Sequence, residues 1–134
     1  MAGYSGKPLV QKLGIKSGST IAVIGAPRGY AHTLGKLPSG VTHRTSAVGP
    51  LDFIQFFSSE KQELERRFAA LARALAPAGM LWISWPKKAS GVTTDLTEDV
   101  IRAVGLAHGL VDVKVAAVDD VWSGLKFVRR LEDR

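Results

Sequence analysis

Five segments of the chain have the hydrophobic pattern of β-strands. Thr20–Ile24, Leu51–Phe57 and Met80–Trp85 are short runs rich in β-branched and aromatic residues, and they predict buried strands. Val111–Val118 and Trp122–Arg130 predict two more strands, which are separated by a connection of three residues. Because so short a connection cannot cross over a sheet, we expect these last two strands to pair in antiparallel orientation.

Two segments in the first 80 residues have the pattern of helices. Pro8–Leu13 is expected to form a short helix that ends at Gly14, since Pro favours the first helical position. Ser59 followed by Gln62 fits a capping box and predicts a helix that reaches about Ala76. Apolar residues at helical spacing are expected to form the buried face of this second helix: Leu64, Phe68, Leu71, Ala72 and Leu75.

A third helix and one irregular segment complete the prediction. Asp95 with Glu98 fits another capping box, and the helix that it opens is expected to end at Gly109. Residues 31–50 are rich in Gly, Pro, Ser and Thr, so we expect a loop there, with a short edge strand near Val41–Ser46.

Strands that alternate with helices predict right-handed crossovers between parallel strands. We therefore expect an α/β fold with three layers, in which a mainly parallel sheet carries an antiparallel C-terminal edge hairpin. The length of 134 residues is that of one compact domain, so residues 1–134 are expected to form a single α/β domain.

Charge is distributed unevenly along the chain. The formal net charge is +6, and residues 1–50 contain six lysines and arginines but no Asp or Glu. Residues 51–134 contain equal numbers of basic and acidic residues, so the whole excess lies in the first third. Such a segment favours an anionic partner. Its cations stand 4 to 12 positions apart, however, and sparse cations are equally typical of an ordinary solubilising surface.

Composition excludes several classes of protein. The absence of cysteine excludes a disulfide scaffold, a thiol nucleophile and cysteine-ligated metal sites. No apolar run approaches the roughly 20 residues of a membrane helix, and the first 16 residues do not have the pattern of a secretory signal. We therefore expect a soluble, cytoplasmic protein.

From Leu51 onward the order of elements resembles a known family. A strand with an early Asp, a helix, the segment Leu75–Ile83, a second helix and two closing strands follow one another. This order resembles the C-terminal half of class I S-adenosylmethionine-dependent methyltransferases, in which a helix ends in a Leu-Lys-Pro-Gly-Gly-like turn and an antiparallel hairpin closes the sheet. Ala76 and Ala78 stand at the Lys and first Gly positions of that turn. The resemblance implies a Rossmann-like, methyltransferase-like fold.

The N-terminal half departs from that family. The family's first strand ends in a Gly-x-Gly-x-Gly-like turn that lets the backbone approach the cofactor. In the corresponding turn here, Gly25–Gly29, Ala26 adds a Cβ and Pro27 has no N–H. The family also binds the ribose hydroxyls with an acidic residue after its second strand, and residues 1–51 contain no acid. We therefore expect a truncated N-terminal half without an S-adenosylmethionine site or another cofactor.

The whole chain also resembles a small bacterial family, a domain of unknown function, which implies no particular activity. The segments that carry this resemblance are Ala2–Gly6, Leu75–Trp82, Trp85–Lys88, Thr94–Val100 and Val121–Lys126.

Two groups of residues are candidates for binding a small anion at the carboxyl ends of the strands, where ligands bind in α/β sheets. Arg28 and Tyr30 follow the first strand, and Arg28 suits a carboxylate or phosphate. The second group precedes a helix and combines an aromatic ring, two cations and three hydroxyls: Trp85, Lys87, Lys88, Ser90, Thr93 and Thr94. The alternative is a well-capped structural loop, because a carboxylate at Asp95 would occupy the same N–H donors.

The sequence predicts no catalytic residue and no metal site. His32, His43 and His108 have no other ligand type at metal-binding spacing, and no Gly-x-Ser-x-Gly motif activates a serine. Three hypotheses of function remain. The first is a non-catalytic methyltransferase-like binding or interaction module, with a protein partner or a second copy over a thinly covered sheet face. The alternative is an enzyme or sensor for a small anionic ligand. Nucleic-acid binding is the least favoured, because no helix-turn-helix or aromatic RNA platform is present.

Overall fold

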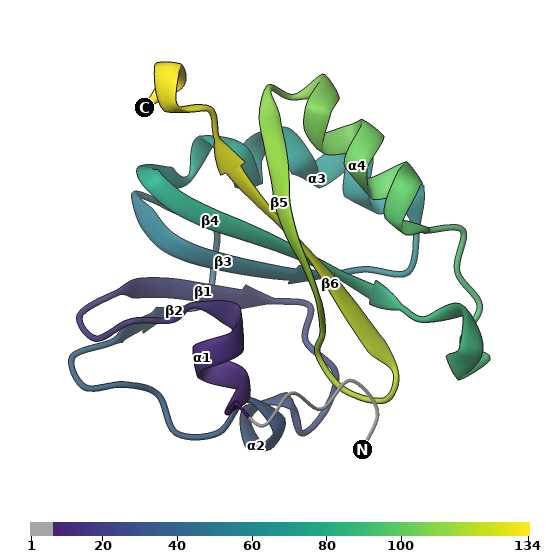
Figure 1. The fold of residues 1–134 in the computed structure, drawn as a ribbon, viewed down its shortest axis with the longest axis horizontal. Helices are drawn as coiled ribbons and strands as arrows, with labels where there is room; N and C mark the ends of the chain where they lie inside the picture. Colours follow the sequence, from purple (N-terminus) through teal and green to yellow (C-terminus); the bar gives the residue numbers. More distant parts are fainter. Residues whose placement is uncertain (1–6) are drawn as a thin grey trace.

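Six strands form one mixed sheet in the order β2-β1-β3-β4-β6-β5 (Figure 1). The structure is a computed structural model and describes residues 7–134. Strands β2, β1, β3 and β4 run parallel, whereas β6 is antiparallel to both β4 and β5. The predicted mainly parallel sheet with an antiparallel C-terminal hairpin is therefore confirmed. The strands are β1 (Thr20–Ile24), β2 (Thr42–Arg44), β3 (Leu51–Phe57), β4 (Leu75–Pro86), β5 (Leu110–Ala117) and β6 (Trp122–Arg129).

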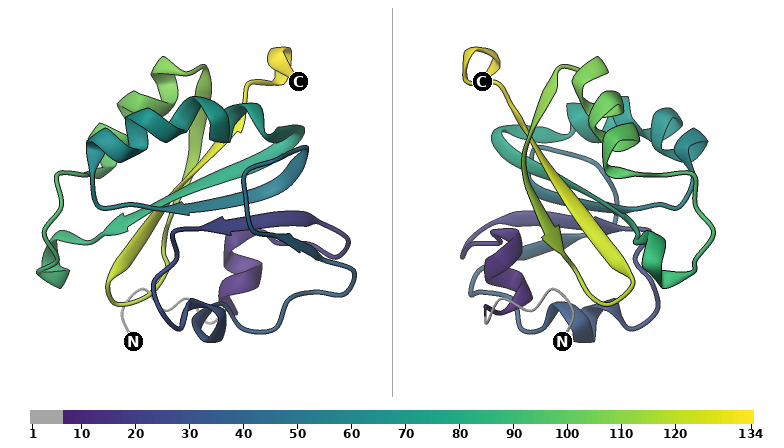
Figure 2. Two further views of the ribbon diagram at one scale, coloured as in Figure 1. Left: turned by 180° about the vertical axis from the view of Figure 1, so that it is seen from behind. Right: turned by 45° about the vertical axis from the view of Figure 1, so that its right-hand side comes forward.

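Helices cover both faces of the sheet and make the three expected layers, but the cover is unequal (Figures 1 and 2). One face carries α3 (Lys61–Arg73) and α4 (Glu98–Ala107). The other carries α1 (Leu9–Leu13) and α2 (Tyr30–Leu34), which have only five residues each. Within residues 7–134, no helix combines the length and apolar character needed to cross a membrane. Two 3₁₀ turns, η1 (Lys88–Ser90) and η2 (Leu131–Asp133), complete the described chain.

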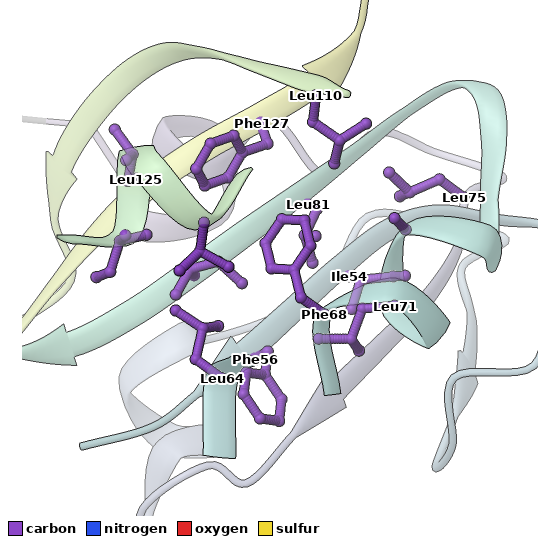
Figure 3. Packing of buried hydrophobic residues seen from close by; sticks show 14 of the residues in the cluster. Ile54, Phe56, Leu64, Phe68, Leu71, Leu75, Leu81, Leu110, Leu125 and Phe127 are labelled. Atoms are coloured by element: carbon purple, nitrogen blue, oxygen red, sulfur yellow. The ribbon is translucent and has the colours of Figure 1, made fainter. Parts of the chain in front are cut away.

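The larger core lies between the sheet and the α3/α4 layer (Figure 3). Leu64, Phe68 and Leu71 recur at helical spacing on α3 and are fully buried against the sheet. The Phe68 ring meets the Phe127 ring edge to face, with 5.7 Å between centroids. Because full burial of one such side chain stabilises the fold by about 1.5–3 kcal/mol, this face supplies much of the driving force for folding.

The smaller core lies under α1 and α2 and relies on large side chains from the sheet. Phe53, Phe57 and Trp82 fill it together with Leu13 of α1. The indole Nε1 of Trp82 donates a hydrogen bond to the Leu13 carbonyl at 2.9 Å. Trp82 therefore both packs under α1 and satisfies a carbonyl at the end of that helix, where carbonyls lack partners within the helix.

The predicted capping boxes are wrong in detail. The N-cap of α3 is Glu60 and not Ser59, and the Asp95 carboxylate accepts a hydrogen bond from the Lys61 backbone N–H at 2.8 Å. Asp95 therefore caps α3 from a distant part of the chain. The N-cap of α4 is Thr97, whose hydroxyl accepts from the Val100 N–H.

Two element boundaries also differ from the prediction. Helix α3 ends at Arg73, and β4 begins at Leu75 instead of Met80, because the Ala74 carbonyl accepts the Leu51 N–H and starts the strand pairing. In the predicted loop of residues 31–50, the edge strand is present as β2, but α2 was not foreseen. Five residues are too few for a helical periodicity to show in the sequence.

Gly105 of α4 is a position at which we expect packing to outweigh helix propensity. Alanine favours a helix by about 1 kcal/mol over glycine. A Cβ at Gly105, however, would lie 2.0 Å from Cε1 of Phe127. We expect Gly105→Ala to lower the free energy of unfolding by about 1–3 kcal/mol, measured by urea unfolding.

The control is the double variant Gly105→Ala/Phe127→Leu, in which the shorter side chain makes room for the added methyl. The double variant should be more stable than the sum of the two single losses predicts. A Gly105→Ala protein as stable as the unaltered chain would contradict this packing of α4 on β6.

Candidate functional site

The candidate residues lie at one edge of the sheet but on its two different faces. Strands β1, β3 and β4 are parallel, so their carboxyl ends meet at the same edge, which we call the strand-end edge. Tyr30, after β1, is buried in the core under α1 and α2. Trp85, at the end of β4, is buried in the core under α3 and α4. The sheet therefore separates Tyr30 of the first candidate group from Trp85 of the second.

Tyr30 closes the α2 side of the strand-end edge. Its side chain is 4% exposed, and its hydroxyl donates a hydrogen bond to Oε1 of Gln55 at 2.6 Å. The Gln55 amide in turn donates to Oγ of Ser84 at 3.1 Å. The three residues form a buried polar chain from α2 across β3 to β4, and each polar side chain in it has a partner.

Aromatic contacts hold Tyr30 in this position. Its ring meets that of Phe57 edge to face at 4.8 Å, and Phe57 meets Trp122 in the same way at 5.1 Å. Burial raises the pKa of the Tyr30 hydroxyl above its ordinary value, and the nearby charge of Asp119 adds to the rise. Tyr30 therefore serves as a neutral, packed side chain that donates a hydrogen bond.

A hollow of about 320 Å³ lies beside Tyr30, between β1, β2 and α2. Its wall is mainly apolar, with Val23, Leu34 and Leu37, and His43 of β2 adds an imidazole. Arg28 is exposed and is not part of this wall. The volume suits a small organic group, but the lining offers little that would hold an anion.

The segment after β4 uses most of its hydroxyls for its own structure. Ser90 Oγ donates to the Lys87 carbonyl at 2.6 Å and accepts from the Val92 N–H, which closes the η1 turn. Thr94 Oγ1 donates to the Ser59 carbonyl at 2.7 Å and accepts from the Leu96 N–H. These bonds support the structural-loop alternative for Ser90 and Thr94.

A second hollow, of about 430 Å³, gathers three of the candidates from this segment. Trp85, Lys88 and Thr94 line it together with Glu98 of α4, whose charge opposes an anion. Thr93 and Lys87 do not line this hollow, and Thr93 is exposed to solvent. The backbone N–H of Lys87 donates a hydrogen bond to the Val121 carbonyl. Lys88 is therefore the candidate cation that borders this hollow.

The residues around β1 and β2 differ from what S-adenosylmethionine needs if it binds as the family resemblance implies. A Cβ at Gly25 would lie 2.9 Å from the Phe57 carbonyl oxygen, so this glycine allows close packing on β3, whereas Ala26, Pro27 and Gly29 line the hollow beside Tyr30. Pro27 offers no N–H. Strand β2 ends in Arg44, and a guanidinium cannot accept hydrogen bonds from ribose hydroxyls as a carboxylate does. The residues at these two positions therefore differ from the donor set that the family resemblance implies.

No three His, Asp or Glu side chains gather to hold a metal ion within residues 7–134. Gln55 and Ser84 were missed as parts of the site, although one signal was present. Gln55 is the polar residue that alternates with Phe53 and Phe57 in an otherwise apolar strand, so it was bound to be buried with a polar partner. His43 gave no such signal, because β2 is a short strand of exposed residues.

Removing the Tyr30 hydroxyl tests the buried polar chain. Tyr30→Phe leaves Oε1 of Gln55 buried without its donor, so we expect a loss of about 1–3 kcal/mol in the free energy of unfolding. Gln55→Met and the double variant complete a cycle. If the two groups interact directly, the double variant should lose less than the sum of the single losses, and strict additivity would contradict the bond.

The raised pKa of Tyr30 also predicts how its contribution depends on pH. In the unfolded chain a tyrosine loses its proton near pH 10, earlier than in the folded protein. Stability from Tyr30 is therefore complete below about pH 10 and falls above it, by at most about 1.4 kcal/mol per pH unit. Urea unfolding between pH 8 and 11.5 should show the gap between the unaltered protein and Tyr30→Phe narrowing above pH 10. A constant gap would contradict the prediction.

Several of the solved structures that superpose on this chain are described as methyltransferases. A SAM-dependent methyltransferase from Aquifex aeolicus superposes with a TM-score of 0.65 at 15% identity, over 89% of this chain and 86% of that one. Precorrin-6y C5,15-methyltransferase from Geobacter metallireducens GS-15 gives 0.61 at 12%, over 91% and 86%. Magnesium protoporphyrin IX methyltransferase from Synechocystis PCC 6803, with bound SAM, gives 0.58 at 13%, over 91% and 74%.

No family model matches the chain, and no curated protein matches it by sequence. The predicted resemblance to the small bacterial family therefore stays a prediction, and its first segment, Ala2–Gly6, lies outside the described residues. At identities of 12–15%, the superpositions establish the fold alone. The chain has the Rossmann-like, mixed α/β fold of class I methyltransferases, as its C-terminal half predicted.

Proposed function

We propose that this chain is a methyltransferase-like binding module and not an enzyme that transfers a methyl group from S-adenosylmethionine. The observation that carries the proposal is the position of Tyr30. Its ring packs on Phe57 and its hydroxyl reaches Gln55, so a protein side chain occupies part of the space beyond the end of β1, beside the hollow that Ala26, Pro27 and Gly29 line. In the family that the fold resembles, this is the turn that approaches the cofactor.

The chemistry at the end of β2 supports the same proposal. The residues there are His43 and Arg44, and residues 1–51 contain no carboxylate to hold ribose hydroxyls. The α1/α2 layer is thin, so a partner has a face on which to bind. We therefore assign this chain the binding of a partner and not the transfer of a methyl group.

Thermal unfolding with and without 1 mM S-adenosylmethionine tests the proposal, with S-adenosylhomocysteine as a second ligand. A ligand present at 100 times its Kd stabilises a protein by about 2.7 kcal/mol, which raises Tm by several degrees in a domain of this size. We expect no rise with either compound. A methyltransferase of known affinity, measured alongside, shows that the ligands are active.

A saturable rise in Tm with either compound would overturn the proposal. If such a rise is seen, the variant Tyr30→Ala tests the role of the Tyr30 side chain. If this side chain obstructs the site, the variant should bind the ligand at least as tightly as the unaltered chain does. Weaker binding would mean that Tyr30 contacts the ligand.

A small anionic ligand remains the second candidate, because Lys88 borders the same hollow as Trp85 and Thr94. An ammonium group beside an indole ring and a hydroxyl suits a phosphate or carboxylate carried on an organic group. The carboxylate of Glu98 lines the same hollow and repels anions, so a ligand with a large negative charge is disfavoured there.

Isothermal calorimetry with mononucleotides and inorganic phosphate tests this second candidate. We expect any binding at the hollow to fall at least tenfold in Lys88→Ala. Lys61→Ala is the matched control, because it removes the same charge from an exposed position on α3. Equal losses in both variants, or no binding at 1 mM, would exclude the hollow as an anion site.

A further inference from the structure

Four lysines from separate segments of the chain gather on the α1 side of the sheet. Lys12 lies in α1 and Lys16 follows that helix, whereas Lys114 and Lys126 are register partners on β5 and β6. The Lys114 ammonium donates a hydrogen bond to the Lys12 carbonyl at 3.0 Å, which joins the hairpin to α1. We call these four residues the lysine surface. Figure 1 shows α1 beside the β5–β6 hairpin.

A β-bulge places Lys114 on this side of the sheet. Residues two apart in a regular strand share a face. Here the register shifts between Asp112 and Lys114, and Val113 is the extra residue. Asp112 consequently faces α4, where it pairs with Arg102, and Lys114 faces α1. The bulge therefore places Asp112 and Lys114 on opposite faces of the sheet, and Lys114 joins the other lysines beside α1.

Three of the four ammonium groups on this surface lie outside the ion pairs of the described residues. Lys16, Lys114 and Lys126 form no ion pair with any residue in the described range 7–134. The pKa of Lys126 is lowered by partial burial and by the charges of Lys114 and Lys16, so these ammonium groups lie close enough to repel one another. The carboxylate that lines a hollow together with Lys16 is Asp52, which accepts a hydrogen bond from the Thr20 N–H.

The rest of the α1/α2 layer extends the positive charge. This layer is formed by the N-terminal third of the chain, whose residues include basic side chains and no acid (Figures 1 and 2). The charge asymmetry of the sequence thus becomes an asymmetry between two sides of the molecule. Acids and bases are mixed in and beside α3 and α4, where six acids (Glu60, Glu63, Glu65, Asp95, Glu98 and Asp99) accompany five bases (Lys61, Arg66, Arg67, Arg73 and Arg102).

The composition of the surface favours one class of partner. Lysine is depleted in the cores of protein–protein interfaces, which are enriched in aromatic residues. Protein–nucleic acid interfaces are far more positively charged, and regularly spaced phosphates attract several ammonium groups at once. Contacts to phosphates position a protein on a nucleic acid without reading its sequence, which is read by contacts to base edges.

We propose that the lysine surface binds the phosphate backbone of a nucleic acid without reading its sequence. The sequence alone disfavoured this partner, because cations so far apart in the N-terminal third need not converge. The structure brings two of them together with two lysines from the C-terminal hairpin. None of the four belongs to the strand-end edge, so the proposal does not depend on whether S-adenosylmethionine binds there.

Fluorescence anisotropy with a labelled 20-base-pair DNA of arbitrary sequence tests the proposal. If the four lysines each neutralise one phosphate, the logarithm of the binding constant should fall with the logarithm of salt concentration with a slope of about −3.6. Affinity should then drop about 100-fold between 50 and 200 mM KCl. A 20-nucleotide single-stranded RNA is the second probe, with a shallower slope of about −0.7 per phosphate.

The double variant Lys16→Met/Lys126→Met removes two charges and leaves the Lys114 hydrogen bond to α1 intact. We expect its slope on DNA to become about −1.8, with a drop of only about 10-fold over the same salt range. The matched control, Lys61→Met/Arg66→Met, removes two charges from exposed positions on α3. It should keep the slope of the unaltered protein. Thermal unfolding confirms that each variant is folded.

Three results would overturn the proposal. The first is no binding of either probe at 50 mM KCl, and the second is an equal change of slope in the control variant. The third is tighter binding of polyglutamate than of a nucleic acid of equal charge, which would assign the surface to an acidic protein instead.

Discussion

The structure depends on one constraint, which is that both faces of a mainly parallel sheet must be covered by apolar groups. Two long helices, α3 and α4, cover one face, but the N-terminal segment supplies only five-residue helices for the other. Large sheet side chains make up the difference. Trp82 packs under α1 and donates to the Leu13 carbonyl, so the same side chain fills space and holds the short helix in place.

The shortness of α2 also bears on how Tyr30 is placed at the strand-end edge. Because α2 is only five residues long, Tyr30 has to reach down to the sheet, where Phe57 and Gln55 hold it. Three polar side chains that satisfy one another, Tyr30, Gln55 and Ser84, then lie buried at this edge. The side chain that covers the sheet here is therefore the one on which our proposed function rests.

Electrostatics follow from the topology in a similar way. The acid-free N-terminal third supplies α1, α2 and the neighbouring strands β1 and β2, so the excess charge of the chain gathers in one part of the molecule. The bulge at Val113 strengthens this separation, since it turns Lys114 toward α1 and leaves Asp112 with Arg102 of α4. A surface that concentrates like charges costs stability when nothing neutralises it. The concentration of lysines beside α1 is therefore the reason to look for an anionic partner at this surface.

The sequence by itself determined the strands Thr20–Ile24 and Leu51–Phe57, the amphipathic face of α3 and the antiparallel closing pair, because hydrophobic period and short connections are local properties. It also determined the likeness of the C-terminal half to methyltransferases. Only the tertiary structure decided that Asp95 caps α3, that Tyr30 and Trp85 lie on opposite faces, and that Lys12 meets Lys114. Each of these depends on contacts between segments far apart in the chain, or on a bulge that reverses the expected face of a strand, and no local pattern encodes either.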